Sequence, residues 1–150
     1  MDTESLLRSL NAHNVRYVII GATAFPVHGY ARATLDIDLF IDPALTNARH
    51  TLAALADVGY DVSDITETDL RTKKLLIRQY ALETDIHPFV AGVTFATVWR
   101  NRVRSRLGKT AANFASLNDL IRMKRATGRP KDQEDLRVLL QLKRDASRRS

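Results

Sequence analysis

The segment from Leu35 to Asp42 alternates strictly between two kinds of side chain. Every second residue is aliphatic, namely Leu35, Ile37, Leu39 and Ile41. The residues between and after them are Asp36, Asp38, Phe40 and Asp42. Side chains repeat with a period of two along a β-strand, so each set occupies one face. The pattern predicts a strand that buries its aliphatic face in a core and presents Asp36 and Asp38 side by side on the other face.

Further strands and helices are predicted around this strand from hydrophobic spacing and from Gly and Pro positions. Strands are expected over residues 16–20, 74–81 and 82–90, with a hairpin over 103–115, and helices near 3–10, 22–30, 45–58, 117–127 and 131–144. The predicted class is α/β (α+β), a small mixed sheet flanked by helices. We expect one domain over residues 1–150, with a core at about 15–115 and a C-terminal helical pair at about 116–146.

Composition narrows the class of protein. The 150 residues include no cysteine, which excludes a thiol nucleophile, a disulfide framework and a cysteine-ligated metal. The longest apolar runs fall far short of the roughly 20 residues that cross a bilayer, and the acidic start, Met1-Asp-Thr-Glu, does not resemble a signal peptide. We therefore expect a cytoplasmic protein with no membrane partner.

The basic charge is concentrated at one end. Residues 1–98 hold eight Lys/Arg and twelve Asp/Glu, a net −4, whereas residues 99–150 hold fifteen and five, a net +10. Such asymmetry is typical of a surface that binds a polyanion, most often nucleic acid. The alternative is a solvated basic helix that contributes only solubility.

The paired carboxylates predict a metal site. Asp36 and Asp38 repel each other unless a cation lies between them, and Mg²⁺ is commonly held by one or two carboxylates together with substrate phosphates. Taken alone, an Asp-x-Asp pair is explained equally well by a solvent-facing strand. The preceding Gly21, which ends a predicted strand and opens a predicted helix, adds a turn where backbone N–H groups can approach a phosphate.

In this context the chain resembles the nucleotidyltransferase superfamily, and in particular small bacterial members that include abortive-infection and toxin–antitoxin toxins. The resemblance rests on Gly21-Ala-Thr-Ala24, His28-Gly29, Arg32-Ala-Thr34, Asp36-Ile-Asp38-Leu39 and Thr84-Asp85-Ile86-His87-Pro88, followed by the segments 117–124 and 128–135. It covers roughly residues 15–140. It implies a polymerase-beta-like core closed by two C-terminal helices.

The resemblance also implies the chemistry and the residues. Asp36, Asp38 and Asp85 become the metal-binding and catalytic carboxylates, with Asp85 also accepting the proton of an attacking hydroxyl. Gly21 and Ala22 become the turn that holds the nucleotide phosphates. Many members have Ser or Gly where this chain has Ala22, so a hydroxyl contact to phosphate is missing here.

Other residues keep two interpretations each. Lys124 lies on the apolar stripe of its helix and needs an anion, either a nucleotide phosphate or a carboxylate such as Asp132 or Asp135. Arg32 is predicted either to contact the triphosphate or to brace Asp36. The two carboxylates Asp132 and Asp135 are explained by favourable charge in the first turn of a helix.

His28 and His87 are predicted to be structural histidines rather than substrate contacts. The predicted function is a Mg²⁺-dependent nucleotidyltransferase of the EC 2.7.7 type, with Mn²⁺ as an alternative metal. It would move a nucleoside monophosphate from an NTP to a hydroxyl on RNA, preferably tRNA, and the toxin-like resemblance adds a cognate antitoxin as a partner. The alternatives are a protein-modifying (AMPylating-type) nucleotidyltransferase and a degenerate module that binds nucleotide or RNA without turnover.

Overall fold

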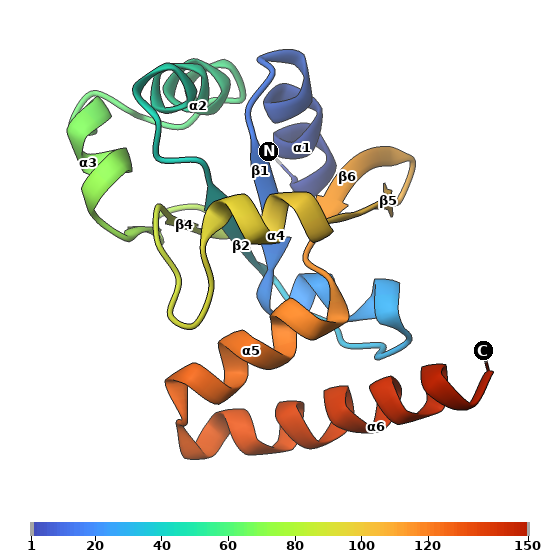
Figure 1. Ribbon diagram of the computed structural model, residues 1–150. Helices are drawn as coiled ribbons and strands as arrows, with labels where there is room; N and C mark the ends of the chain where they lie inside the picture. The colour runs from blue at the N-terminus through green and yellow to red at the C-terminus, as the bar shows by residue number, and fades with distance from the viewer. Residues whose placement is uncertain (1, 150) are drawn as a thin grey trace.

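The computed structural model of the protein describes residues 2–149 and contains a six-stranded mixed sheet (Figure 1). The strands are β1 (Tyr17–Ile20), β2 (Asp36–Ile41), β3 (Leu75–Ile77), β4 (Glu83–His87), β5 (Val103–Leu107) and β6 (Thr110–Phe114), in the order β3-β4-β2-β1-β6-β5. The pairs β2–β4 and β1–β6 are parallel and the other three are antiparallel. The predicted fold class and the predicted hairpin at the C-terminal end of the sheet are confirmed.

Helices lie at four of the predicted places, near residues 3–10, 45–58, 117–127 and 131–144, and two short helices, over residues 67–72 and 95–101, add to them. The helices are α1 (Thr3–Ala12), α2 (Leu45–Asp57), α3 (Glu67–Thr72), α4 (Phe95–Asn101), α5 (Leu117–Thr127) and α6 (Gln133–Arg149), with 3₁₀ turns η1 (Gly21–Ala24), η2 (Pro26–His28) and η3 (Pro130–Asp132). The helix predicted over residues 22–30 is wrong in type, because the chain forms two separate 3₁₀ turns there. Pro26 begins the second turn, where its missing N–H removes the bond that a continuous helix needs.

The alternation in β2 sorts its side chains onto two covered faces. Ile37, Leu39 and Ile41 are buried on the side of α1, where Tyr17 on the adjacent strand donates its hydroxyl to Asn11. On the other side, Phe40 is buried beneath α4. Leu35 is an exception to the predicted apolar face: it precedes the first residue of the strand and is 79% exposed.

The C-terminal helices form a layer below the end of β1 in Figure 1. α5 ends at Gly128, whose φ of 58° is in the left-handed region that favours glycine. The chain then turns through η3 into α6, which continues to Arg149, beyond the predicted end. Within residues 2–149, no helix is both long and apolar enough to cross a membrane.

Candidate active site

The sheet brings two carboxylates of the predicted site together. In the register of the parallel pair, Asp38 on β2 lies beside Asp85 on β4, while Ile20 at the end of β1 lies on the other side of Asp38. Side chains at paired positions point to the same face of a sheet. Asp38 and Asp85 therefore converge on the face covered by α4.

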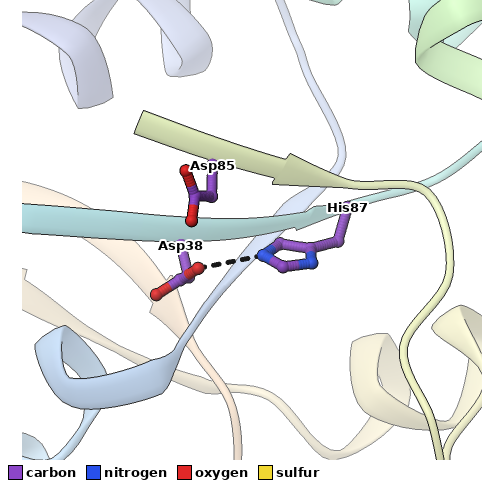
Figure 2. Close-up of side chains that lie close together, drawn as sticks. All are labelled: Asp38, Asp85 and His87. Carbon is purple, nitrogen blue, oxygen red and sulfur yellow. Dashed lines mark hydrogen bonds and ion pairs between the residues drawn. The ribbon is translucent and has the colours of Figure 1, made fainter. Parts of the chain in front are cut away.

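A histidine joins them. His87 follows Asp85 by two residues on the same strand, and its Nε2 lies 2.9 Å from Oδ1 of Asp38 (Figure 2). One ligand atom from each of Asp38, Asp85 and His87 can be chosen so that all three lie within 4.8 Å of one another. Two carboxylate oxygens and an imidazole nitrogen form a donor set that can hold a divalent metal ion.

Asp85 is the most buried member of the group, with 9% of its surface exposed. Its Oδ2 accepts a hydrogen bond of 3.1 Å from Arg78, but its buried Oδ1 has no hydrogen-bond partner in the described chain. Burial raises the pKa of the Asp85 carboxyl, and the charge of Asp38 raises it further, against the opposing effect of Arg78. A cation between the two aspartates would satisfy the unpaired oxygen and offset the repulsion, so these residues fit a metal.

Asp36 lies one step further along the same face but outside this group. It is exposed and pairs in register with Glu83. Burial raises the pKa of the Asp36 carboxyl, and the neighbouring Glu83 contributes the next largest rise. Arg78 donates to Glu83 at 2.7 Å as well as to Asp85, so one guanidinium partly neutralises the acidic row formed by the two strands.

Gly21 lies so close to the Asp38 carboxylate that only glycine fits at this position. Its φ is +71°, and a Cβ at this position would lie 2.7 Å from Oδ2 of Asp38. Any larger residue would therefore displace the carboxylate, in addition to adopting a backbone conformation that L-residues rarely use. Ala22, the next residue, is half-buried in η1.

A pocket of about 600 Å³ opens between these residues and α5. Its wall combines site residues, apolar side chains and three cations: Gly21, Asp38, His87, Phe89, Val90, Met123, Lys74, Lys124 and Arg129. Phe89 is 62% exposed despite its size. An apolar wall with a few charged groups at one end is typical of a small-molecule site.

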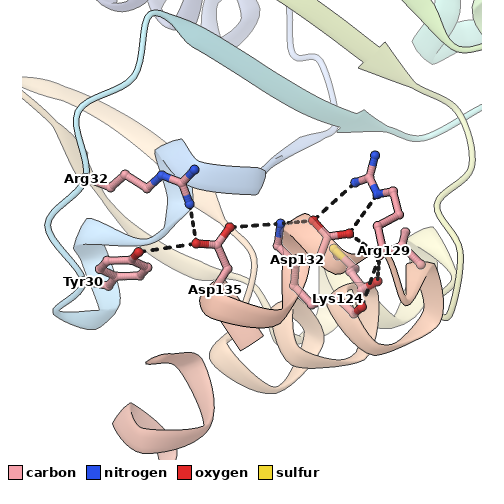
Figure 3. A network of polar contacts seen from close by, with 8 residues as sticks. Tyr30, Arg32, Lys124, Arg129, Asp132 and Asp135 are labelled. Carbon is pink, nitrogen blue, oxygen red and sulfur yellow. Dashed lines mark hydrogen bonds and ion pairs between the residues drawn. The ribbon is translucent and has the colours of Figure 1, made fainter. Parts of the chain in front are cut away.

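Lys124 reaches this pocket from a polar network that joins α5 to α6 (Figure 3). Its Nζ lies 3.1 Å from Asp132 and 3.4 Å from Asp135. Asp135 also accepts hydrogen bonds from Tyr30 and Arg32. The carboxylate interpretation of Lys124 is thus confirmed, and the interpretation that Arg32 braces Asp36 is wrong, since the Arg32 guanidinium pairs with Asp135.

The two network carboxylates are more than first-turn acids. Asp132 is 3% exposed and Asp135 is 6% exposed. Burial raises the pKa of Asp132, but hydrogen bonds from Arg129, Thr127 and Lys124 outweigh that effect and bring it down to about 2. The explanation from helix-end charge alone is therefore incomplete, because these acids are buried partners of three cations.

The sequence interpretation missed two residues of the site. His87 was predicted to be structural, yet it contacts Asp38; its position two residues after Asp85 on one strand face is the signal that places it there. Arg78 was not singled out from the sequence; the strand expected over residues 74–81 ends at Ile77 in the structure, and Arg78 follows directly after it. His28 is structural as predicted, with its Nε2 2.8 Å from the carbonyl oxygen of Ala115.

This combination of a mixed sheet, adjacent strand carboxylates and a glycine turn is that of a nucleotidyltransferase core. Residues 2–143 match the model of a family described as nucleotidyltransferase of unknown function (DUF6036). Because the match spans nearly the whole chain, the protein belongs to this family, and the resemblance seen in the sequence is confirmed at the level of the superfamily. None of the curated proteins matches the chain.

Proposed function

We propose that the protein transfers a nucleoside monophosphate from an NTP to a hydroxyl of RNA, with tRNA as the preferred acceptor. The observation that carries the proposal is the convergence of Asp38, Asp85 and His87 beside a pocket large enough for a nucleotide. The pocket volume of about 600 Å³ lies within the usual range for small-molecule sites, roughly 300–1,000 Å³. The net +10 of residues 99–150 supports a nucleic-acid acceptor.

The nucleotide would lie with its base against the apolar wall and its phosphates toward the cations. Phe89 and Met123 offer the apolar surface, and Lys74 and Lys124 offer positive charge in the same pocket. The absence of a side chain at Gly21 lets the backbone of the turn lie directly against the Asp38 carboxylate, and both residues line the pocket in which the phosphates would lie. Ala22 offers only its backbone N–H in place of a hydroxyl.

Asp38, Asp85 and His87 would hold the metal, Mg²⁺ or Mn²⁺, and Asp36, two residues before Asp38 on the same strand face, would add a further carboxylate beside them. A divalent ion bound there stabilises the negative charge that develops on the transferring phosphoryl group. The nitrogen of His87 makes Mn²⁺ as suitable as Mg²⁺, because imidazole is a softer ligand than carboxylate.

In the transfer step, the oxygen of the acceptor hydroxyl forms a bond to the α-phosphorus. The bond from that phosphorus to the bridging oxygen breaks, and pyrophosphate leaves with its electron pair. Asp85 takes the hydroxyl proton, a role that a carboxylate beside the reacting phosphorus can perform as general base. The remaining contribution of the protein is positioning and charge stabilisation.

The test is incubation of the protein with each α-labelled NTP, with Mg²⁺ and with Mn²⁺, first with bulk tRNA and then with cell lysate. Label on RNA supports the proposal. Label on protein would favour a protein-modifying nucleotidyltransferase, and nucleotide binding without any label would favour a degenerate binding module. The matched controls are Asp38→Asn and the exposed loop variant Asp64→Asn, which removes the same charge away from the site.

A further inference from the structure

The single tryptophan of the chain lies under two arginines at the surface of α4. The Cζ atom of Arg102 is 3.7 Å from the centroid of the Trp99 ring, and that of Arg16 is 4.7 Å from it. Arg102 also donates a hydrogen bond of 2.8 Å to the carbonyl oxygen of Trp99. Cation–π contacts of this kind hold the two guanidinium groups in place before any ligand arrives.

A third arginine adds to the same cluster, and few acids balance it. Arg104 is exposed on β5, and burial together with the charges of Arg104 and Arg16 lowers the pKa of Arg102. Arg16 has a weak ion pair with Asp42 at 3.5 Å, whereas neither Arg102 nor Arg104 has a carboxylate partner among residues 2–149. The Nε of Arg102 is buried without an acceptor. We call Arg16, Trp99, Arg102 and Arg104 the Trp99 surface.

The Trp99 surface lies on the same side of the sheet as the carboxylates. Phe40, two residues after Asp38 on that face, packs edge to face on Phe95 at 5.2 Å, and Phe95 stacks on Trp99 at 5.8 Å. Arg16 pairs with Asp42 at the far end of β2. Asp42 follows Asp38 by four residues, which corresponds to about 13 Å along a strand. Figure 1 shows α4 crossing in front of β2 and β1.

We propose that the Trp99 surface binds the phosphate backbone of the acceptor RNA and holds it across α4, so that its reactive end reaches Asp38. The proposal rests on the function proposed above, because it assigns a surface to that acceptor. Guanidinium groups match phosphate oxygens in a two-pronged geometry. Closely spaced arginines, of which Arg102 and Arg104 have no carboxylate partner among residues 2–149, favour a ligand with closely spaced negative charges, which a nucleic-acid backbone supplies.

The test measures RNA binding without NTP or metal, so that catalysis plays no part. Because Trp99 is the sole tryptophan, its fluorescence reports directly on this surface while a short single-stranded RNA is titrated in. We expect the Trp99 emission to change and the logarithm of the affinity to fall linearly with the logarithm of salt concentration. Anisotropy of end-labelled RNA gives the affinity independently.

The decisive variant combines Arg16→Gln, Arg102→Gln and Arg104→Gln. Removing three phosphate contacts is expected to lower the magnitude of the salt slope by about 2 and to weaken binding at least tenfold at low salt. The matched control, Arg137→Gln with Arg144→Gln and Arg148→Gln, removes the same charge from exposed positions on α6 and is expected to bind RNA nearly as the wild type does. Because Arg102 is packed on Trp99, the exposed single variant Arg104→Glu serves if the triple variant does not fold.

Four results would overturn the proposal. The first two are unchanged RNA affinity in the triple variant, or in Arg104→Glu where it replaces that variant, and an equal loss of affinity in the α6 control. The other two are Trp99 emission that does not respond while RNA binds, and polyglutamate that binds as tightly as RNA. The last would indicate an acidic protein partner instead. Failure of the function proposed above is a separate result. RNA bound at the Trp99 surface but never labelled refutes the transfer reaction, whereas RNA labelled normally by a triple variant with normal affinity refutes only the surface.

Discussion

Replacing Asp132 by Asn should destabilise the protein through the turn that joins α5 to α6. Asp132 is 3% exposed and accepts hydrogen bonds from Lys124 (3.1 Å), Thr127 (2.8 Å) and Arg129 (2.8 Å). Asn has nearly the same shape and keeps the contact with the Thr127 hydroxyl. It removes the charge that both cations face, so the variant isolates the charge-assisted part of the network.

The size of the effect follows from the pKa of Asp132. The pKa falls from an ordinary 3.8 to about 2 on folding, and each unit is worth about 1.36 kcal/mol. The ionised carboxylate therefore contributes about 2.4 kcal/mol to the free energy of unfolding at pH 7. Since the folded-state pKa is depressed, this contribution is complete above the unfolded value of 3.8 and is lost as the pH falls towards 2. It should amount to about 1.3 kcal/mol at pH 3.

The assay is urea unfolding of wild type and Asp132→Asn at pH 7, 4 and 3, with Asp64→Asn as the exposed control. We expect the difference in unfolding free energy to be about 2.4 kcal/mol at pH 7, about 2.2 at pH 4 and about 1.3 at pH 3, and close to zero throughout for the control. At pH 7 the difference corresponds to a Tm decrease of roughly 5–10 °C. A difference below about 0.5 kcal/mol at pH 7, or one that does not shrink on acidification, would refute the charge-assisted account.

Three further predictions concern the nucleotide site. Asp38→Asn should keep the fold but lower the rate of transfer more than 100-fold, on the order expected when a charge-stabilising group is lost. It should also abolish any Tm rise on adding Mn²⁺, and a Tm rise equal to that of Asp64→Asn would argue against the metal site. Gly21→Ala should lower stability by more than about 1 kcal/mol in thermal unfolding, because its Cβ would lie 2.7 Å from a carboxylate oxygen of Asp38. Ala22→Ser should tighten NTP binding by up to roughly 1.5–3 kcal/mol, the value of a hydrogen bond to a charged group, and unchanged affinity would place the phosphates elsewhere.

The strand that carries Asp38 could be predicted because its two faces differ: Ile37, Leu39 and Ile41 all enter the aliphatic core, whereas the opposite face carries Asp36 and Asp38. That condition imposes a period of two on β2, and the period is visible in the sequence without any tertiary information. The C-terminal end of α5 was equally visible, because Gly128 takes up a left-handed conformation that few other residues adopt. Both features depend on local geometry, which neighbouring residues encode.

The contacts between elements could not be read in this way. The strand face that His87 shares with Asp85 is a local feature, but its contact with Asp38, like that of Arg78 with Asp85, requires β4 to pair in parallel with β2 and antiparallel with β3. Neither register is encoded in a local pattern. The burial of Asp132 is a similar case. An acid near the start of a helix normally faces solvent, and here it is buried because cations from α5 and from the turn before α6 surround it.

The charge balance of the α5–α6 network leaves positive charge beside the pocket even though Lys124 pairs with carboxylates. Three cations, Lys124, Arg129 and Arg32, surround two buried carboxylates, so the network holds one positive charge in excess. Lys124 and Arg129 also line the pocket beside Asp38, which places this excess where the proposed phosphates would lie. Ion pairing therefore positions Lys124 without neutralising the network as a whole. Asp132→Asn raises the excess to two positive charges and should by charge alone strengthen the attraction for phosphate. A loss of NTP affinity in that variant, measured under conditions where it remains folded, would therefore report lost positioning of Lys124.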